Sequence, residues 1–176
     1  MRGPKSLVRS GSCADGTILV ECSSPAYVRW ARAKIAEGQG EDGQGGATSP
    51  HRVTLYATCV VSESDPAGAR ATARRATAKY LGDGGSTDVT APLSFGADLA
   101  ALIAAGGREA LMQGMEDEWL DDLAITGRPE EGAAAIARLQ AAGADAVVLV
   151  PPADADADAW LDRVGDELLP VLDERE

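Results

Sequence analysis

The sequence predicts an α/β fold in which parallel strands alternate with outer helices. Apolar runs at residues 17–20, 53–61 and 146–150 have the length and composition of strands buried on both faces. Two of these runs are followed by a cap residue and a proline, Ser24-Pro25 and Asp65-Pro66, which is the pattern of a helix start. Such strand-helix units with short connections indicate parallel strands joined by right-handed crossovers.

The first elements follow one another closely. Gly3-Pro4-Lys5-Ser6-Leu7 begins an apolar helix, and Ala14-Asp15-Gly16 ends it directly before the first strand. The helix after Ser24-Pro25 places apolar residues such as Tyr27 and Ile35 on one face. The stretch 38–49 that follows is so rich in glycine that we expect a flexible surface loop.

The second half repeats the alternation around one irregular segment. A stripe of alanines predicts a helix after Asp65-Pro66, and Pro129-Glu130-Glu131 begins another helix with acids at its positive end. Between them, residues 82–122 predict an insertion with two short helices, at 95–105 and 108–122, covering one end of the sheet. Strand 146–150 and a terminal helix complete the series.

Composition limits the class of function. The 176 residues suffice for one domain with its own core. The formal net charge of −12 argues against nucleic acid, whose binding needs clustered lysine and arginine. No leader or membrane-spanning run is recognisable, so we expect a cytoplasmic protein without a membrane partner. One histidine and three cysteines without C-x-x-C spacing favour reduced thiols and no metal site.

Three strands are few for a complete domain of this kind. An open parallel sheet leaves unpaired backbone groups along both edges, whereas an eight-stranded barrel has no edges. The strand count therefore predicts a partial (β/α)8 barrel, in which the chain forms one half.

Three ordered stretches resemble the luciferase-like monooxygenase superfamily. They are the Gly3-Pro4 to Gly16 unit, the run Leu123-Ala-Ile-Thr-Gly-Arg-Pro-Glu-Glu131, and the run Ala141-Ala-Gly-Ala-Asp-Ala-Val-Val-Leu149. Together they span nearly the whole chain in the order in which the family has them. The resemblance implies the C-terminal half of a TIM-like barrel enzyme that uses coenzyme F420 or FMN for hydride transfer or monooxygenation of a small-molecule substrate.

The resemblance also implies which residues lie near the cofactor. The Gly-Pro turn of the family approaches the ribityl-phosphate side, which assigns Gly3 and Pro4, with Lys5 as a charge partner. The strand after Ala-Asp-Gly ends beside the cofactor, which places Leu19 and Glu21 near it. We assign no catalytic residue.

The sequence departs from the family pattern where it begins. Met1-Arg2 stands in place of the strand that should lead into Gly3-Pro4, and nothing corresponds to the first half of the barrel. We therefore expect an oxidoreductase portion that is incomplete alone. Two alternatives remain: a non-catalytic half-barrel that self-associates or pairs with another half, and a small-molecule binding α/β module.

Four other features have simpler structural interpretations. His51 reads as a solvated loop residue and Cys22 as a small buried or rim residue. The carboxylates at 116–122 read as a hydrated helix face, and Asp154-Ala-Asp-Ala-Asp158 lacks the glycine and the final acid of a calcium loop.

Overall fold

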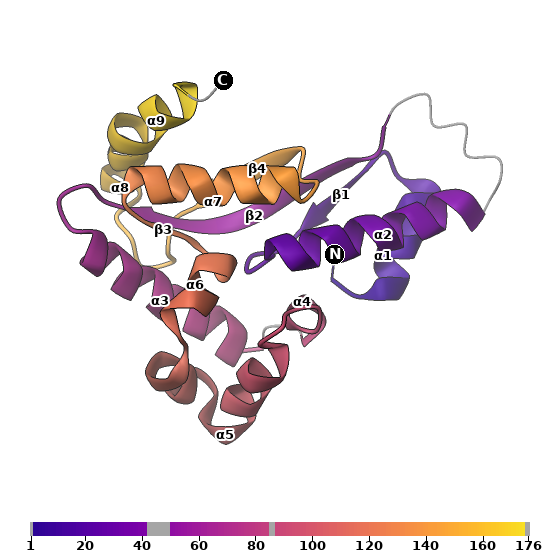
Figure 1. The fold of residues 1–176 in the computed structure, drawn as a ribbon, viewed down its shortest axis with the longest axis horizontal. Coiled ribbons are helices and arrows are strands. Elements are labelled where there is room, and N and C mark those ends of the chain that lie inside the picture. Colours follow the sequence, from indigo (N-terminus) through magenta and orange to yellow (C-terminus); the bar gives the residue numbers. More distant parts are fainter. Residues whose placement is uncertain (1, 42–49, 85–86, 175–176) are drawn as a thin grey trace.

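One long strand, β2, organises the sheet of the computed structural model, which describes residues 2–41, 50–84 and 87–174. In these ranges the strands are β1 (Gly16–Leu19), β2 (Arg52–Val61), β3 (Ile125–Gly127) and β4 (Ala146–Val150). All of their pairings are parallel, as the sequence predicts. The sheet is open, so the fold is an α/β partial barrel (Figure 1).

Each of the other strands pairs with a different stretch of β2. β1 pairs with 52–55, β4 with 54–58, and β3 with 59–61. The strand β3 was not expected, because its three buried residues lie within the run that leads into the next helix. Such a short strand carries no periodicity of its own.

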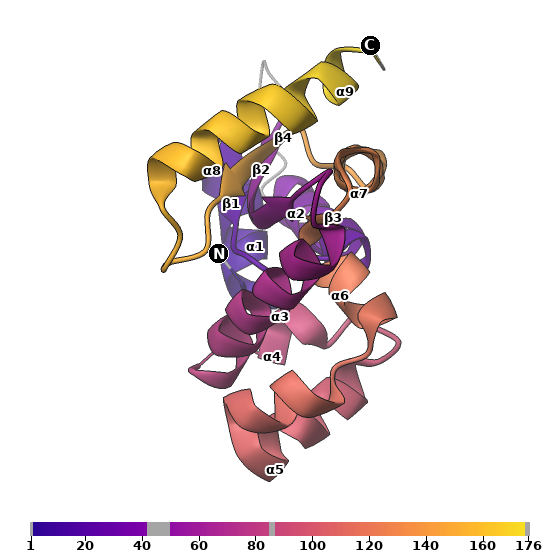
Figure 2. The same cartoon turned by 90° about the vertical axis from the view of Figure 1, so that its left-hand side faces the viewer.

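The helices pack around this sheet. In the described ranges they are α1 (Pro4–Cys13), α2 (Pro25–Glu41), α3 (Pro66–Gly82), α4 (Thr87–Thr90), α5 (Gly96–Gly114), α6 (Asp117–Leu123), α7 (Pro129–Ala141), α8 (Ala157–Arg163) and α9 (Leu169–Asp173). A π-helical turn, Val164–Leu168, joins α8 to α9, two residues before Pro170, which has no N–H for the α-helical bond. Figure 2 shows this terminal helix and the α3–α5 group on opposite sides of β2.

The expectation that the strands are buried on both faces was wrong for one face. Leu19, Val53 and Leu55 are fully buried under the helices. On the other face, Ile18 is 52% exposed, Tyr56 40% and Val148 39%. The pairing register places these three side chains on one side of the sheet, because paired residues and residues two apart share a face.

Helices α1 and α2 approach each other closely through glycine. A Cβ at Gly11 would lie 2.1 Å from the Ile35 carbonyl oxygen, and one at Gly38 would lie 1.9 Å from that of Val8. The predicted loop at 38–49 therefore begins too early, because its first four residues, 38–41, continue α2. Its other positions, 42–49, lie outside the described residues.

The segment 82–122 is more helical than expected. It contains α4, the long helix α5, which is broken at Gly106-Gly107, and α6. Helix α5 packs on α3, and both views place it beyond α3 from the strands (Figures 1 and 2). Across the described residues, none of the helices is long and apolar enough to cross a lipid bilayer.

Candidate functional site

A cavity of about 580 Å³ lies at the carboxyl ends of the parallel strands β1 and β4 and beside the second half of β2. Glu21, two residues beyond β1, Thr58 of β2 and Val150 of β4 line it from the sheet. Helix α3 contributes Arg75, Ala76, Lys79 and Tyr80, and the segment after β4 contributes Pro151, Pro152, Ala153 and Asp154. The carboxyl edge of a parallel sheet is where α/β folds and barrels place their ligands.

The sheet side of the cavity continues the exposed face. Thr58 and Val150 pair in register, two residues beyond Tyr56 and Val148, and therefore point to the same side. In a closed barrel one face of the sheet turns inward. The cavity therefore lies at the carboxyl end of the face that such a barrel encloses.

The side chains of Glu21 and Tyr80 give the cavity a hydrogen-bond acceptor and a hydrogen-bond donor. The Thr58 hydroxyl donates to the Glu21 carboxylate, with 2.7 Å between Oγ1 and Oε2. Burial raises the pKa of Tyr80, and the nearby Cys22 and Glu21 also raise it, while Arg2 opposes this shift. Tyr80 therefore stays protonated near neutral pH and can donate a hydrogen bond, while Glu21 accepts one.

The cavity also collects positive side chains in a strongly acidic protein. Arg2, Arg75, Lys79 and Arg108 line it, together with the acids Glu21, Asp83 and Asp154. Among the described residues, no ion pair involves any of these four cations. The chain as a whole has a net charge of −12, so this local excess of cations runs against the composition.

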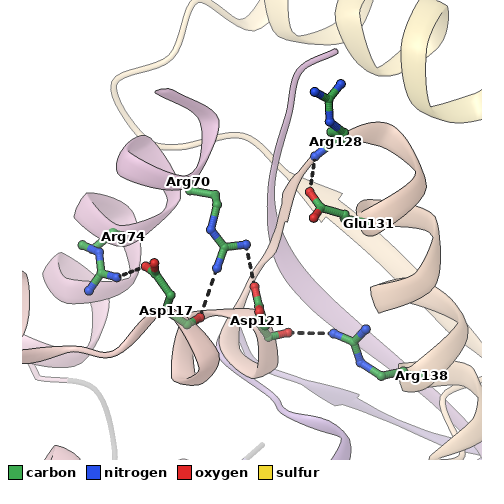
Figure 3. A network of polar contacts seen from close by, with 7 residues as sticks. All are labelled: Arg70, Arg74, Asp117, Asp121, Arg128, Glu131 and Arg138. Atoms are coloured by element: carbon green, nitrogen blue, oxygen red, sulfur yellow. Dashed lines mark hydrogen bonds and ion pairs between the residues drawn. The ribbon is translucent and has the colours of Figure 1, made fainter. Parts of the chain in front are cut away.

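The other two arginines of α3, Arg70 and Arg74, form ion pairs with aspartates of α6. Arg70 binds Asp121 with 2.7 Å between Nη1 and Oδ1, and Arg74 forms an ion pair with Asp117. Arg138 of α7 donates to the Asp121 carbonyl, so the network joins α3, α6 and α7 (Figure 3). The carboxylates of 116–122, expected to form a hydrated face, thus include two that hold helices together.

Glycines bring Arg108 to the cavity. A Cβ at Gly82 would lie 2.5 Å from the Arg108 backbone nitrogen, so only glycine allows this approach of α3 and α5. Gly107, with φ of +54°, breaks α5 directly before Arg108, in a backbone conformation that favours glycine. In the sequence, the Gly-Gly pair before Arg108 indicates a helix break. The sequence does not show that this break lies against Gly82.

The residues assigned from the family resemblance do not gather in one place. Glu21 lines the cavity, whereas Leu19 is fully buried in the core. Gly3 is the N-cap of α1, and a Cβ there would lie 3.1 Å from the Asp88 carboxylate. Pro4 and Lys5 are exposed, and of this turn the neighbouring Arg2 is the residue that reaches the cavity. Cofactor binding by Gly3, Pro4 and Lys5 stays a prediction.

The expectation for His51 was wrong. His51 is buried and lies just before β2, at the amino end of the sheet and away from the cavity. Its Nε2 lies 2.8 Å from the Thr17 hydroxyl, which in turn lies 2.7 Å from the Ser10 hydroxyl. The β-strand register brings Thr17 next to His51, a proximity that the sequence separation of the two residues hides.

The two buried cysteines, Cys22 and Cys59, are structural. Cys22 is buried, and burial together with the adjacent Glu21 raises the pKa of its thiol. Burial also raises the pKa of Cys59 to about 12. Neither thiol is a ready nucleophile at neutral pH, in agreement with the interpretation of Cys22 as a small buried residue.

Comparison with known proteins identifies the family. The chain belongs to the luciferase-like monooxygenase family, whose model matches residues 2–146. A search of curated protein sequences finds no match.

Two solved structures share the fold. A coenzyme F420-dependent tetrahydromethanopterin reductase from Methanopyrus kandleri matches with a TM-score of 0.71 and 23% identity, over 97% of this chain and 49% of that one. An F420-dependent secondary alcohol dehydrogenase, solved with an F420-acetone adduct, matches with a TM-score of 0.58 and 16% identity, over 97% and 46%. The chain spans about half the length of each.

Proposed function

We propose that this chain carries the cofactor and substrate cavity of an oxidoreductase that works with coenzyme F420, with FMN as the other candidate. The observation that carries the proposal is the position of the cavity at the carboxyl ends of β1 and β4, beside Thr58 of β2, in a member of the luciferase-like monooxygenase family. Both solved structures described above are F420-dependent oxidoreductases, which favours F420 over FMN.

The residues present fit such a cofactor. About 580 Å³ is within the usual range of roughly 300–1,000 Å³ for small-molecule sites. Val150, Pro151 and Pro152 form an apolar wall, while Glu21 and Tyr80 offer an acceptor and a donor. The bound cofactor supplies the hydride chemistry, and these side chains bind and orient it.

Fluorescence titration of the purified chain with F420, and separately with FMN, tests this function. We expect saturable quenching at micromolar cofactor, stronger for F420. The absence of quenching by either cofactor at these concentrations contradicts a cofactor site formed by this chain. Circular dichroism of the same sample establishes that the protein used is folded.

We propose, as a second candidate, that a second copy of the chain covers the exposed sheet face. The four strands of the described residues, taken twice, equal the eight of a closed barrel, and the solved structures above are about twice as long. Tyr56 and Val148 lie paired on this face, and large apolar side chains exposed together mark interaction surfaces.

Light scattering after size exclusion decides this candidate. We expect a dimer at tens of micromolar, and a monomer for Tyr56→Glu, which places a charge in the centre of the face. Leu161→Glu is the matched control, because Leu161 is also an exposed apolar residue, at 59%, but belongs to helix α8 and not to a strand of the sheet. A monomeric wild-type chain, or equal dissociation by both substitutions, rules out the second copy.

A further inference from the structure

We infer that Arg75, Lys79 and Arg108 form a subsite for an anionic group, a phosphate or carboxylate, of the molecule that the cavity takes. The inference rests on the proposed function for what that molecule is. The subsite itself rests on the geometry and charge of these three residues.

The subsite is built by two helices. Arg75 and Lys79 are four residues apart on α3 and so lie on the same helical face, one turn apart. Arg108 reaches the same cavity from α5, because the backbone contact at Gly82 holds the break in α5 against the end of α3. Three cations from two packed helices therefore line one wall.

The charge pattern of α3 separates this wall from the structural arginines. Arg70 and Arg74 also stand four residues apart, and each is neutralised by an aspartate of α6 (Figure 3). In the part of the chain that the structure describes, Arg75, Lys79 and Arg108 form no ion pair, and Arg75 donates one hydrogen bond, from Nη2 to the Thr72 hydroxyl at 2.8 Å. One helix thus uses one pair of cations for packing and leaves the next pair facing the cavity.

The acids that line the cavity do not fully offset the positive charge of this wall. Glu21 lies at the sheet side, where it accepts the Thr58 hydroxyl, and Asp154 follows β4. Asp83, the C-cap of α3, lies one turn beyond Lys79 and is the acid nearest this wall, and in the described residues no ion pair joins it to Lys79. With Arg2 included, four cations face three acids. Guanidinium groups bind phosphate and carboxylate through paired hydrogen bonds, which suits an anionic group at this wall.

Calorimetric titration with inorganic phosphate at low ionic strength tests the subsite alone. We expect Arg75→Gln/Lys79→Gln to weaken phosphate binding by roughly tenfold or more, since charge-assisted hydrogen bonds are lost. Arg75→Lys/Lys79→Arg keeps the charge and should retain binding. Arg9→Gln/Arg29→Gln removes the same charge outside the cavity and should also retain it. Added salt should weaken the wild-type affinity through screening.

Titration with FMN and with riboflavin, which lacks the phosphate, identifies the source of the anion. If Arg75→Gln/Lys79→Gln weakens the binding of FMN roughly tenfold but leaves the binding of riboflavin unchanged, the subsite holds the cofactor phosphate. If both flavins bind as before while inorganic phosphate is lost, the subsite serves an anionic substrate.

Two outcomes separate this inference from the proposed function. If the wild-type chain binds no flavin and no F420, yet binds phosphate through Arg75 and Lys79, the proposed function fails and the subsite stands. If the wild-type chain binds no phosphate, or Arg75→Gln/Lys79→Gln and Arg9→Gln/Arg29→Gln affect it equally, the subsite is overturned.

Discussion

At the residue scale, polar side chains fasten the amino end of the sheet. The Asp145 carboxylate accepts from the Val53 N–H at 2.6 Å and from Arg32 at 2.5 Å, both to Oδ2. Arg32 also donates to the carbonyls of Gly143 and His51. This cluster ties α2 to the beginnings of β2 and β4. In barrels, residues at this end serve stability, whereas chemistry occupies the other end.

We expect Asp145→Asn to lower the free energy of unfolding by about 1 kcal/mol at pH 7, a value reduced for a side chain that is 40% exposed. Burial pushes the pKa of Asp145 up, but the hydrogen bonds from Val53 and Arg32 outweigh it, so the net pKa is lowered. A lowered folded-state pKa gives stability that is present above the unfolded value of about 3.9 and is lost as pH falls towards the folded value.

Urea unfolding at pH 7 and pH 3 therefore checks this expectation. The difference between wild type and Asp145→Asn should shrink at pH 3, because below the unfolded pKa the unfolded chain takes up a proton at Asp145 that the folded state resists. A difference that is equal at both pH values would show that the carboxylate charge has no part in it. Asp173→Asn, at the exposed end of α9, is the control for loss of a surface charge.

The buried threonines give a second matched pair. Thr17 bridges Ser10 and His51, so Thr17→Val leaves His51 Nε2 buried without its partner and leaves Ser10 Oγ only the longer bond to the Gly16 carbonyl at 3.5 Å. The substitution should cost about 2 kcal/mol of stability. Thr77 is as buried, but its hydroxyl has no hydrogen-bond partner in the described residues, so Thr77→Val should be neutral or stabilising. Thermal melts of both variants measure the contrast. Equal losses would refute the bridging role of Thr17.

At the element scale, the close packing of α1 on α2 depends on two glycines as well as on buried apolar side chains. Gly11 and Gly38 let one helix backbone touch the other. From the sequence, the glycines at the end of α2 indicate a loop, because glycine is a poor helix former. Tertiary contact overrides that propensity, so the end of α2 could not be placed without knowing its neighbour.

Alanine substitutions along α2 test this packing. Gly38→Ala should destabilise by about 1–3 kcal/mol, because its Cβ would overlap the Val8 carbonyl oxygen. Gly40→Ala, two residues further along the same helix, meets nothing within 4 Å and should stabilise by up to about 1 kcal/mol. Chemical unfolding of both variants gives the comparison. Stabilisation by Gly38→Ala would contradict the close approach.

The strands and helices differ in how far they could be predicted. Alternating apolar runs and Ser-Pro or Asp-Pro starts correctly place β1, β2, β4, α2 and α3. The short strand β3 stayed hidden because three residues show no pattern. The burial of both sheet faces was inferred from apolar runs, yet Ile18, Tyr56 and Val148 are exposed, because composition cannot say whether a partner covers a face.

At the scale of the whole molecule, the cavity is a product of tertiary structure. Of the residues assigned from the family resemblance, Glu21 lines this cavity. The strand that precedes Glu21 was predictable from the local sequence. Arg75, Lys79 and Arg108 come from helices whose relative placement depends on Gly82 and the break in α5. In the sequence of this acidic chain, Arg75 and Lys79 stand one helical turn apart, but nothing local indicates that Arg108 lies beside them.

Because the sheet is open, the two sides of this cavity differ. The helices close one side, and the exposed face that holds Tyr56 and Val148 continues from the other. A second copy on that face would enclose the cavity further, so cofactor affinity and dimerisation should rise together. A ligand that binds more tightly to the dimer than to the monomer stabilises the dimer by mass action. Cofactor binding and dimerisation, the two proposed functions, are coupled in this way.

The most direct test of the central claim is an F420 titration that compares Ala153→Trp with Ala36→Trp. Ala153 is exposed and lines the cavity, whereas Ala36 is exposed on α2 and does not line it. We expect Ala153→Trp to narrow the cavity and to weaken F420 binding by roughly tenfold or more, a loss of about 1.4 kcal/mol for each factor of ten. Ala36→Trp should bind F420 as the wild-type chain does. Equal F420 affinity of the two variants would contradict the assignment of this cavity to the cofactor.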